Sequence, residues 1–209
     1  MLFYLEYSAK GVFTLKKFCL LFITLLSVTL LFSCSGTDKN KPEKDSYTIE
    51  IEIEEYGTIT ALLDAKSAPI TVKNFIDNVN DGFYNGLTFH RIMKGFMMQG
   101  GDKNGDGFNN EGTPEIKGEF LLNGVKNDLS HTRGTLSMAR ANGYDTASTQ
   151  FFIVQQDSLH LDGQYAAFGK VISGMEIVDD ICNNTVVIGN NGYVPEENRP
   201  VIKEIRVVE

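Results

Sequence analysis

The sequence has little cysteine and little clustered positive charge. None of its three cysteines belongs to a Cys-x-x-Cys pair or to a Cys/His cluster. A structural zinc site needs four such ligands at short spacings, so we expect no metal site of this kind. The formal net charge is -8, and no basic stripe is visible along the chain. Nucleic-acid binding depends on clustered Lys and Arg, so we expect no nucleic-acid partner.

Long apolar runs are also missing, apart from one near the N-terminus. Residues 18–32 are apolar almost throughout, but fifteen residues at about 1.5 Å rise each fall short of the ~30 Å hydrocarbon core of a membrane. Lys10, Lys16 and Lys17 precede this run, and a small residue, Ser33, follows it. This order predicts a secretory leader. An uncleaved short anchor is the alternative.

The residues after the run, Leu31-Phe32-Ser33-Cys34, resemble the lipobox of bacterial lipoproteins. In that motif the cysteine carries the lipid and becomes the mature N-terminus. We therefore expect a signal peptide over 1–33, a flexible tether over 34–46 that starts at lipidated Cys34, and a folded domain over 47–209. Such a protein is anchored to the membrane of the cell envelope, with its domain in the periplasm or on the cell surface. Cys182 is then left without a disulfide partner and is expected to be a buried, unreactive thiol.

Alternating apolar residues predict many short strands, and 3.6-residue spacing predicts two helices. The helices are expected from Ser67, as N-cap, to Asp81-Gly82, and over 174–183. The first helix would bury Val72, Phe75, Ile76 and Val79. The strands are expected at 47–53, 57–63, 87–92, 96–99, around Phe120, and at 135–139, 150–154, 166–171 and 201–208. Many short strands with two separate helices fit a closed antiparallel barrel.

One predicted hairpin carries a cation among large apolar groups. Its strands are 87–92 and 96–99, joined by a turn at Met93-Lys94-Gly95. Pairing across this turn predicts Arg91 opposite Met97, Phe89 opposite Gln99, and all four on one face. An arginine, an amide and a thioether side by side suit a recognition surface better than a core. The Gly100-Gly101 pair that follows suggests positive φ or a close backbone approach.

A second predicted strand, 148–154, has a similar pattern. Gln150 and Phe152 would point one way, and Phe151 and Ile153 the other. An amide and a ring would again share a face, in front of two core positions. Together with the hairpin, this strand predicts a binding site.

Four segments, in this order, resemble the cyclophilin-type peptidyl-prolyl isomerases: FHRIMKGFMMQGGD (89–102), RGTLSMARA (133–141), STQFFI (148–153) and LDGQYAAFGKV (161–171). The resemblance extends from about Tyr47 to the C-terminus. It implies a mainly β fold, an eight-stranded antiparallel barrel capped by a helix at each end. It also implies isomerisation of Xaa–Pro bonds in proline-containing polypeptides, by a monomer that needs no cofactor or metal.

The resemblance also implies roles for individual residues. The proline ring would lie in a socket formed by Phe96, Met97, Phe152 and Leu161. Arg91 would donate to the prolyl nitrogen, and Gln99 and Gln150 would orient Arg91 or the substrate carbonyl. Ala139 and Arg140 would contact the residue before the proline. His160 and Tyr165 stand where many eukaryotic members have Trp and His, which implies weak sensitivity to inhibitors of the cyclosporin class.

Several alternatives stay open. The same fold can bind proline-containing segments without catalysis, and a lost arginine or a filled socket would indicate this. Asp102–Gly107 matches the first half of an EF-hand loop, but the closing position is Thr113, so calcium binding is the weaker reading. His90 is expected to be a structural, hydrogen-bonding residue and not a base. His160 could contact substrate or lie at the rim without a task, and His131 has no partner that the sequence identifies.

Overall fold

The computed structural model of this chain describes residues 42–108 and 112–208. The expected signal peptide and Cys34 lie outside these residues. At the described end of the expected tether, the carbonyl oxygen of Asp45 accepts a hydrogen bond from the amide of Ala65 at 2.9 Å. No helix within the described residues is long and apolar enough to cross a membrane.

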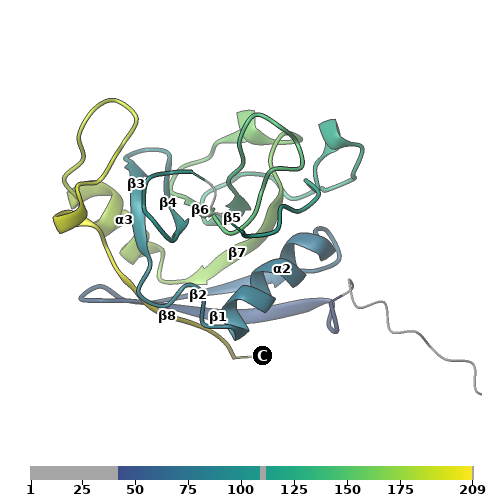
Figure 1. The fold of residues 1–209 in the computed structure, drawn as a ribbon, viewed down its shortest axis with the longest axis horizontal. Coiled ribbons are helices and arrows are strands. Elements are labelled where there is room, and N and C mark those ends of the chain that lie inside the picture. Colours follow the sequence, from purple (N-terminus) through teal and green to yellow (C-terminus); the bar gives the residue numbers. More distant parts are fainter. Residues whose placement is uncertain (1–41, 109–111, 209) are drawn as a thin grey trace, which may run out of the picture. The chain divides into compact units, whose positions relative to one another are not determined.

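Eight strands form one sheet in which every pair is antiparallel. The strands are β1 (Ser46–Ile53), β2 (Gly57–Asp64), β3 (Thr88–Met93), β4 (Met97–Asp102), β5 (Thr135–Met138), β6 (Phe151–Val154), β7 (Ala167–Ser173) and β8 (Ile202–Val207). Their order across the sheet is β3-β4-β6-β5-β7-β2-β1-β8. Figure 1 shows β8 running beside β1 and β2, with β3 to β6 above them.

The sheet curls until its two end strands approach each other. Thr88 of β3 forms an isolated antiparallel bridge with Val201, which directly precedes β8. The amide of Ile202 donates to the carbonyl of Leu87 at 2.7 Å, and the amide of Phe89 donates to Pro200 at 3.0 Å. These few bonds join the edges, as a barrel requires. The predicted fold class, an eight-stranded antiparallel barrel with two helices, is confirmed.

Helix α2 (Pro69–Asn80) buries the predicted side chains Val72, Phe75, Ile76 and Val79. Its N-terminus differs from the prediction, because the N-cap is Ala68 and Ser67 instead donates to Asp64 of β2 at 2.8 Å. The carboxylate of Glu119 takes the capping role, since it accepts the backbone amides of Ile70 at 3.0 Å and Thr71 at 2.7 Å. A carboxylate at this end also complements the helix dipole.

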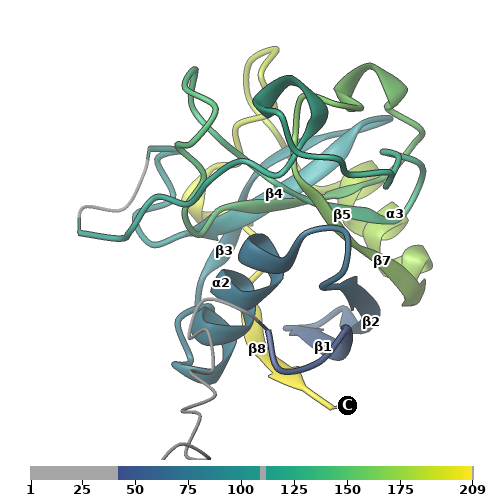
Figure 2. The same cartoon turned by 90° about the vertical axis from the view of Figure 1, so that its right-hand side faces the viewer.

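Helix α3 (Met175–Asn184) buries Val178, Ile181 and Cys182, and the burial of Cys182 agrees with the prediction. Burial raises the pKa of the Cys182 thiol to about 12, which agrees with an unreactive core residue. Figure 2 shows α2 and α3 well apart. The core between the sheet and α2 is rich in aromatic rings, with Phe75 5.3 Å from Phe151 and 5.1 Å from Phe168, measured between ring centroids.

The strand predicted around Phe120 is wrong. Phe120 is buried, but the backbone after it forms a short 3-10 helix, η1 (Leu121–Asn123). Its two leucines are exposed, and the turn ends at Gly124 with positive φ. The apolar run Phe120-Leu121-Leu122 therefore reflects one anchoring ring and two surface side chains. Two further 3-10 helices are η2 (Leu159–Leu161) and η3 (Glu196–Asn198).

Candidate active site

The β3–β4 hairpin forms as predicted, but its register is different. Arg91 lies opposite Gln99 and not opposite Met97, because the hairpin closes with Met93 opposite Met97. Phe89 lies opposite Gly100 and belongs to the main core, so it does not share a face with Arg91. The shift between Phe89 and Arg91 amounts to one residue and moves Phe89 to the other face of the strand, so it explains the error for Phe89 alone.

The two glycines of β4, Gly100 and Gly101, behave as the sequence suggests. Gly101 has φ of 83°, and a Cβ there would lie 2.6 Å from the carbonyl oxygen of Thr149. A Cβ on Gly100 would lie 2.9 Å from the carbonyl oxygen of Thr88. These close approaches let β4 pass tightly between its neighbours.

A cavity of about 200 Å³ opens beside the hairpin. Its lining is Arg91, Phe96, Met97, Gln99, Ala139, Arg140, Phe152, Leu161 and Tyr165. Met97, Phe152 and Leu161 are buried and form, with Val154, a small apolar cluster separate from the main core. The cavity is smaller than the roughly 300–1,000 Å³ of pockets for drug-sized ligands, so it suits one or two residues of a peptide. Nine of the eleven predicted catalytic and substrate-binding residues thus meet at one place.

Arg91 is held in place by three contacts. Its Nε donates to the carbonyl of Asn191 at 2.8 Å, its Nη1 to Oε1 of Gln99 at 3.1 Å, and its Nη2 to Sδ of Met93 at 3.0 Å. A guanidinium has five N–H groups. Two of them therefore have no partner among the described residues. Burial lowers the pKa of Arg91, while nearby Tyr165 acts in the opposite direction, and an arginine remains cationic at neutral pH.

Gln99 and Gln150 form a directed chain of hydrogen bonds behind Arg91. Nε2 of Gln99 donates to Oε1 of Gln150 at 2.9 Å, and Nε2 of Gln150 donates to the carbonyl of Phe108 at 2.8 Å. Each amide thus has its oxygen turned toward the donor before it. Gln150 orients Gln99, which orients Arg91, and Gln150 itself is not part of the cavity lining.

A buried histidine that the sequence left without a partner lies behind the cavity. The ring of His131 stacks on Phe152, with centroids 6.1 Å apart and an angle of 19°. Its Nδ1 lies 2.8 Å from Oδ1 of Asp162, and its Nε2 lies 3.0 Å from Oγ of Ser137. Burial lowers the pKa of His131, although Asp162 opposes this shift. Asp162 and Ser137 lie 31 and 6 residues from His131 in the sequence, so no sequence motif could identify them as its partners.

The hydrogen-bonding role predicted for His90 is wrong. Its ring is buried, and neither ring nitrogen bonds to another described residue. Burial lowers its pKa, and the charges of Asp102 and Arg199 act in opposite directions. His90 is therefore a neutral buried ring at neutral pH.

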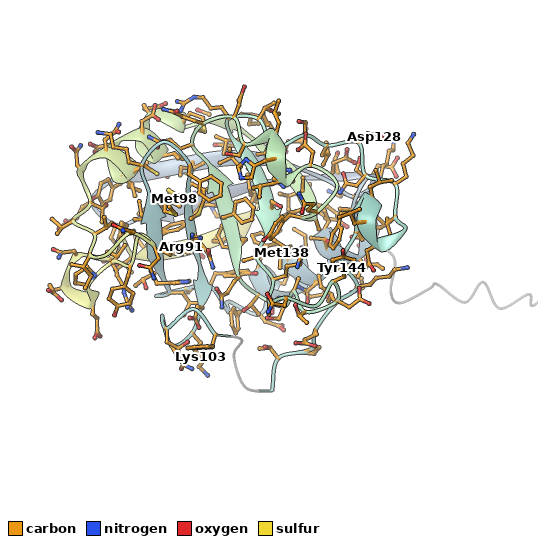
Figure 3. All side chains as sticks on the ribbon, turned by 90° about the horizontal axis from the view of Figure 1, so that it is seen from above. Arg91, Met98, Lys103, Asp128, Met138 and Tyr144 are labelled. Atoms are coloured by element: carbon orange, nitrogen blue, oxygen red, sulfur yellow. The ribbon has the colours of Figure 1, made fainter. Side chains whose placement is uncertain are left out.

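His160 lies outside the cavity lining. It is exposed on η2, with its ring centroid 5.8 Å from that of Phe96. Tyr165 does line the cavity, and its ring meets Phe152 edge-on at 6.2 Å. In Figure 3, Met138 lies between Arg91 and Tyr144. Tyr144 belongs to the loop that follows β5.

The loop suggested for calcium turns its first carboxylate inward. Oδ1 of Asp102 accepts the amide of Asn104 at 3.1 Å, and Oδ2 accepts the amide of Gly107 at 2.6 Å. Across residues 42–108 and 112–208, no three His, Cys, Asp or Glu side chains come together in a way that could hold a metal ion.

Comparison with known proteins agrees with this geometry. The family model described as cyclophilin type peptidyl-prolyl cis-trans isomerase/CLD matches residues 48–208. Peptidyl-prolyl cis-trans isomerase A of Dickeya dadantii is 44% identical over 70% of this chain and 76% of its own length. Peptidyl-prolyl cis-trans isomerase B of Escherichia coli is 38% identical over 74% of this chain and 96% of its own length.

A solved structure is similar over the same region. It is a Cryptosporidium parvum cyclophilin-type peptidyl-prolyl cis-trans isomerase, crystallised in the presence of the dipeptide Ala-Pro. It is 29% identical, covers 78% of this chain and 99% of its own, and superposes with a TM-score of 0.66. The chain therefore belongs to the cyclophilin-type peptidyl-prolyl cis-trans isomerase family, as an isomerase of Xaa–Pro bonds.

Proposed function

We propose that this isomerase acts on proteins exported to the bacterial cell envelope, as a lipid-anchored monomer, with Arg91 as its catalytic residue. Rotation about an Xaa–Pro bond is slow because it breaks amide resonance, at a barrier of about 18–20 kcal/mol. No covalent bond is made or cut. The site therefore needs a socket for the ring, a donor for the nitrogen and a grip on the flanking chain.

The observation that carries this mechanism is the guanidinium of Arg91 beside an apolar cavity. As the amide twists, its nitrogen loses conjugation and regains a lone pair. A donor aimed at that nitrogen bonds more strongly to the twisted state than to the planar one, and this difference lowers the barrier. Two N–H groups of Arg91 have no partner among the described residues and remain for this task. Lowering the barrier by about 7 kcal/mol corresponds to roughly 10⁵-fold acceleration.

The socket would hold the proline ring against Phe96, Met97, Phe152 and Leu161, which all line the cavity. Non-catalytic binding of proline segments is the rival function. Two features would favour it, a lost arginine or a filled socket. Arg91 is present and the cavity is open, at about 200 Å³, so the geometry supports catalysis.

The test compares the Arg91→Ala variant with the unchanged protein. Exchange between cis and trans forms of a model Xaa–Pro peptide is followed by NMR, and peptide binding is measured in the same samples. Loss of one donor of this type costs about 10²–10³-fold in rate, so we expect that loss in kcat with little change in binding. Arg206→Ala, which removes an exposed arginine paired with Glu50 outside the cavity, is the matched control. Equal exchange rates for Arg91→Ala and the unchanged protein would contradict the proposed mechanism.

The envelope location rests on the leader and on Leu31-Phe32-Ser33-Cys34. Cys34→Ala removes the only lipid acceptor of the motif. We expect this variant to move from the membrane fraction to the soluble envelope fraction, while its exchange activity stays the same. A variant that remains with the membrane would contradict anchoring at Cys34.

A further inference from the structure

The cavity has a second guanidinium, that of Arg140, enclosed by three aromatic rings. Its central carbon lies 4.6 Å from the ring centre of Tyr165 and 5.3 Å from those of Phe120 and Tyr144. Nε donates to the carbonyl of Gln164 at 3.1 Å, and Nη1 donates to that of Ala141 at 2.9 Å. Stacking and hydrogen bonds thus hold the cation in place before any ligand arrives, which reduces the entropy cost of binding to it.

No carboxylate neutralises this cation. Arg133 pairs with Asp179 at 2.6 Å, whereas Arg91 and Arg199, like Arg140, bond only to neutral groups among the described residues. Arg140 makes no ion pair within the described part of the chain, and its Nη2 makes no hydrogen bond there. The cavity lining contains two arginines and no acidic side chain. Acidic groups are abundant in the rest of the chain, whose formal net charge is -8.

We infer that Arg140 makes the site prefer substrates that carry Asp or Glu in one of the two positions before the proline. The inference rests on the proposed function. If Arg91 bonds to the prolyl nitrogen, the preceding residue is attached directly at that nitrogen, and successive Cα atoms are about 3.8 Å apart. Arg140 lines the same small cavity as Arg91, so a carboxylate one or two residues before the proline can reach it. The planar guanidinium suits a carboxylate.

A purely structural role is the competing explanation, because Arg140 also stacks on Tyr165 and bonds to its own loop. That role does not depend on the charge of the substrate. The two explanations therefore separate in a ratio of rates for peptides that differ only in charge, and not in the overall rate of a variant.

The experiment uses the full-length protein and matched peptides with Glu, Gln or Lys at either of the two positions before proline. NMR exchange gives kcat/KM, and titration gives Kd. A half-exposed ion pair is worth about 0.2–1 kcal/mol, so at one position we expect the Glu peptide to exceed the Gln peptide by about two- to fivefold, and the Lys peptide to fall below it. In 1 M salt, where the Debye length is about 3 Å, the Glu/Gln ratio should approach one.

Three variants complete the test. Arg140→Gln should bring the Glu/Gln ratio to one, Arg140→Lys should keep part of the preference, and Lys66→Gln, which removes an equal charge outside the cavity, should keep all of it. A ratio of one at both positions in the unchanged protein, or a full preference in Arg140→Gln, overturns the inference. If Arg140→Gln fails to fold, the Lys peptide and the salt series decide the matter in the unchanged protein. Equal acceleration of the Glu and Gln peptides overturns this inference but leaves the proposed function intact. No acceleration of any peptide contradicts the proposed function. In that case the ratio of the Kd values for the Glu and Gln peptides tests this inference.

Discussion

Acid should destabilise this protein through two buried histidines well before its carboxylates titrate. Burial lowers the pKa of both His90 and His131 in the folded state, so both stay neutral there. In the unfolded chain each ring takes up a proton below about pH 6.5. The unfolded state then binds more protons than the folded state, and the free energy of unfolding falls as the pH falls.

The magnitude follows from the number of rings. Each proton taken up only by the unfolded chain changes the stability by about 1.4 kcal/mol per pH unit. Between pH 7.5 and 5.5 the loss should be at most about 1.4 kcal/mol for each histidine, the limit for a ring that stays neutral in the folded state over this whole range. The loss stops once the pH falls below the folded-state pKa values. Asp162, Asp179 and Asp145 have lowered pKa values, so their contribution to stability is lost only in a more acidic range, below about pH 4.

The charges around the two rings do not reverse this sign. Asp162 faces His131 and raises its pKa, and Asp102 does so for His90, while Arg199 and Arg91 lower the pKa of His90. In both cases burial is the largest effect and lowers the pKa. His131 loses its solvation but keeps only one carboxylate partner, so the neutral ring is favoured.

Urea unfolding at pH values from 8 to 5 measures this effect. His131→Gln should reduce the slope between pH 7.5 and 5.5, and the double variant with His90→Gln should reduce it further. The comparison uses slopes, because each substitution also changes the stability at pH 8. A stability that is constant from pH 7.5 to 5.5 in the unchanged protein, or an undiminished slope in the double variant, would refute the reasoning.

Three further predictions concern the fold and the site. Gly101→Ala should lower the free energy of unfolding in urea by about 1–3 kcal/mol, because the added Cβ would lie 2.6 Å from a carbonyl oxygen and the backbone is strained at φ of 83°. The control Gly112→Ala, with φ of 82° and open space around it, should lose only the strain energy of about 1–2 kcal/mol. Equal losses in the two variants would contradict the role of close packing. Glu119→Ala should cost about 0.5–2 kcal/mol, since it leaves two amides of α2 uncapped, and an unchanged urea midpoint would show that the cap is dispensable. Gln99→Leu should reduce kcat for peptide exchange about tenfold with little change in Kd, because Arg91 loses a hydrogen bond worth about 1.5–3 kcal/mol; a change in Kd alone would show that Gln99 only binds substrate.

Much of the fold could be predicted because local patterns carry it. The alternation over β1 predicts its buried isoleucines, Ile49, Ile51 and Ile53, and the helical spacing predicts the buried face of α2. Gly101 was predicted from its type alone, since few other residues adopt positive φ. These features depend on residues within a few positions of one another.

Several failures share one cause, which is distance along the chain. Glu119 caps α2 from 48 and 49 residues away, and the carbonyl of Asn191 holds Arg91 from 100 residues away. Backbone carbonyls leave no trace in residue type, so no motif could have identified Asn191. The register of the β3–β4 hairpin was missed because the hairpin closes with Met93 opposite Met97 and because the pairing then shifts between Phe89 and Arg91.

The sequence by itself determined which chemical groups are available: an arginine, two amides and several apolar rings in segments that resemble one family. Only the tertiary structure decided which of them meet. It turned Phe89 into the core, held Arg91 by three contacts, and placed Arg140 in an aromatic cage at the same cavity. Side-chain type is local information, whereas the orientation of a guanidinium depends on acceptors supplied by strands and loops that are adjacent only after folding.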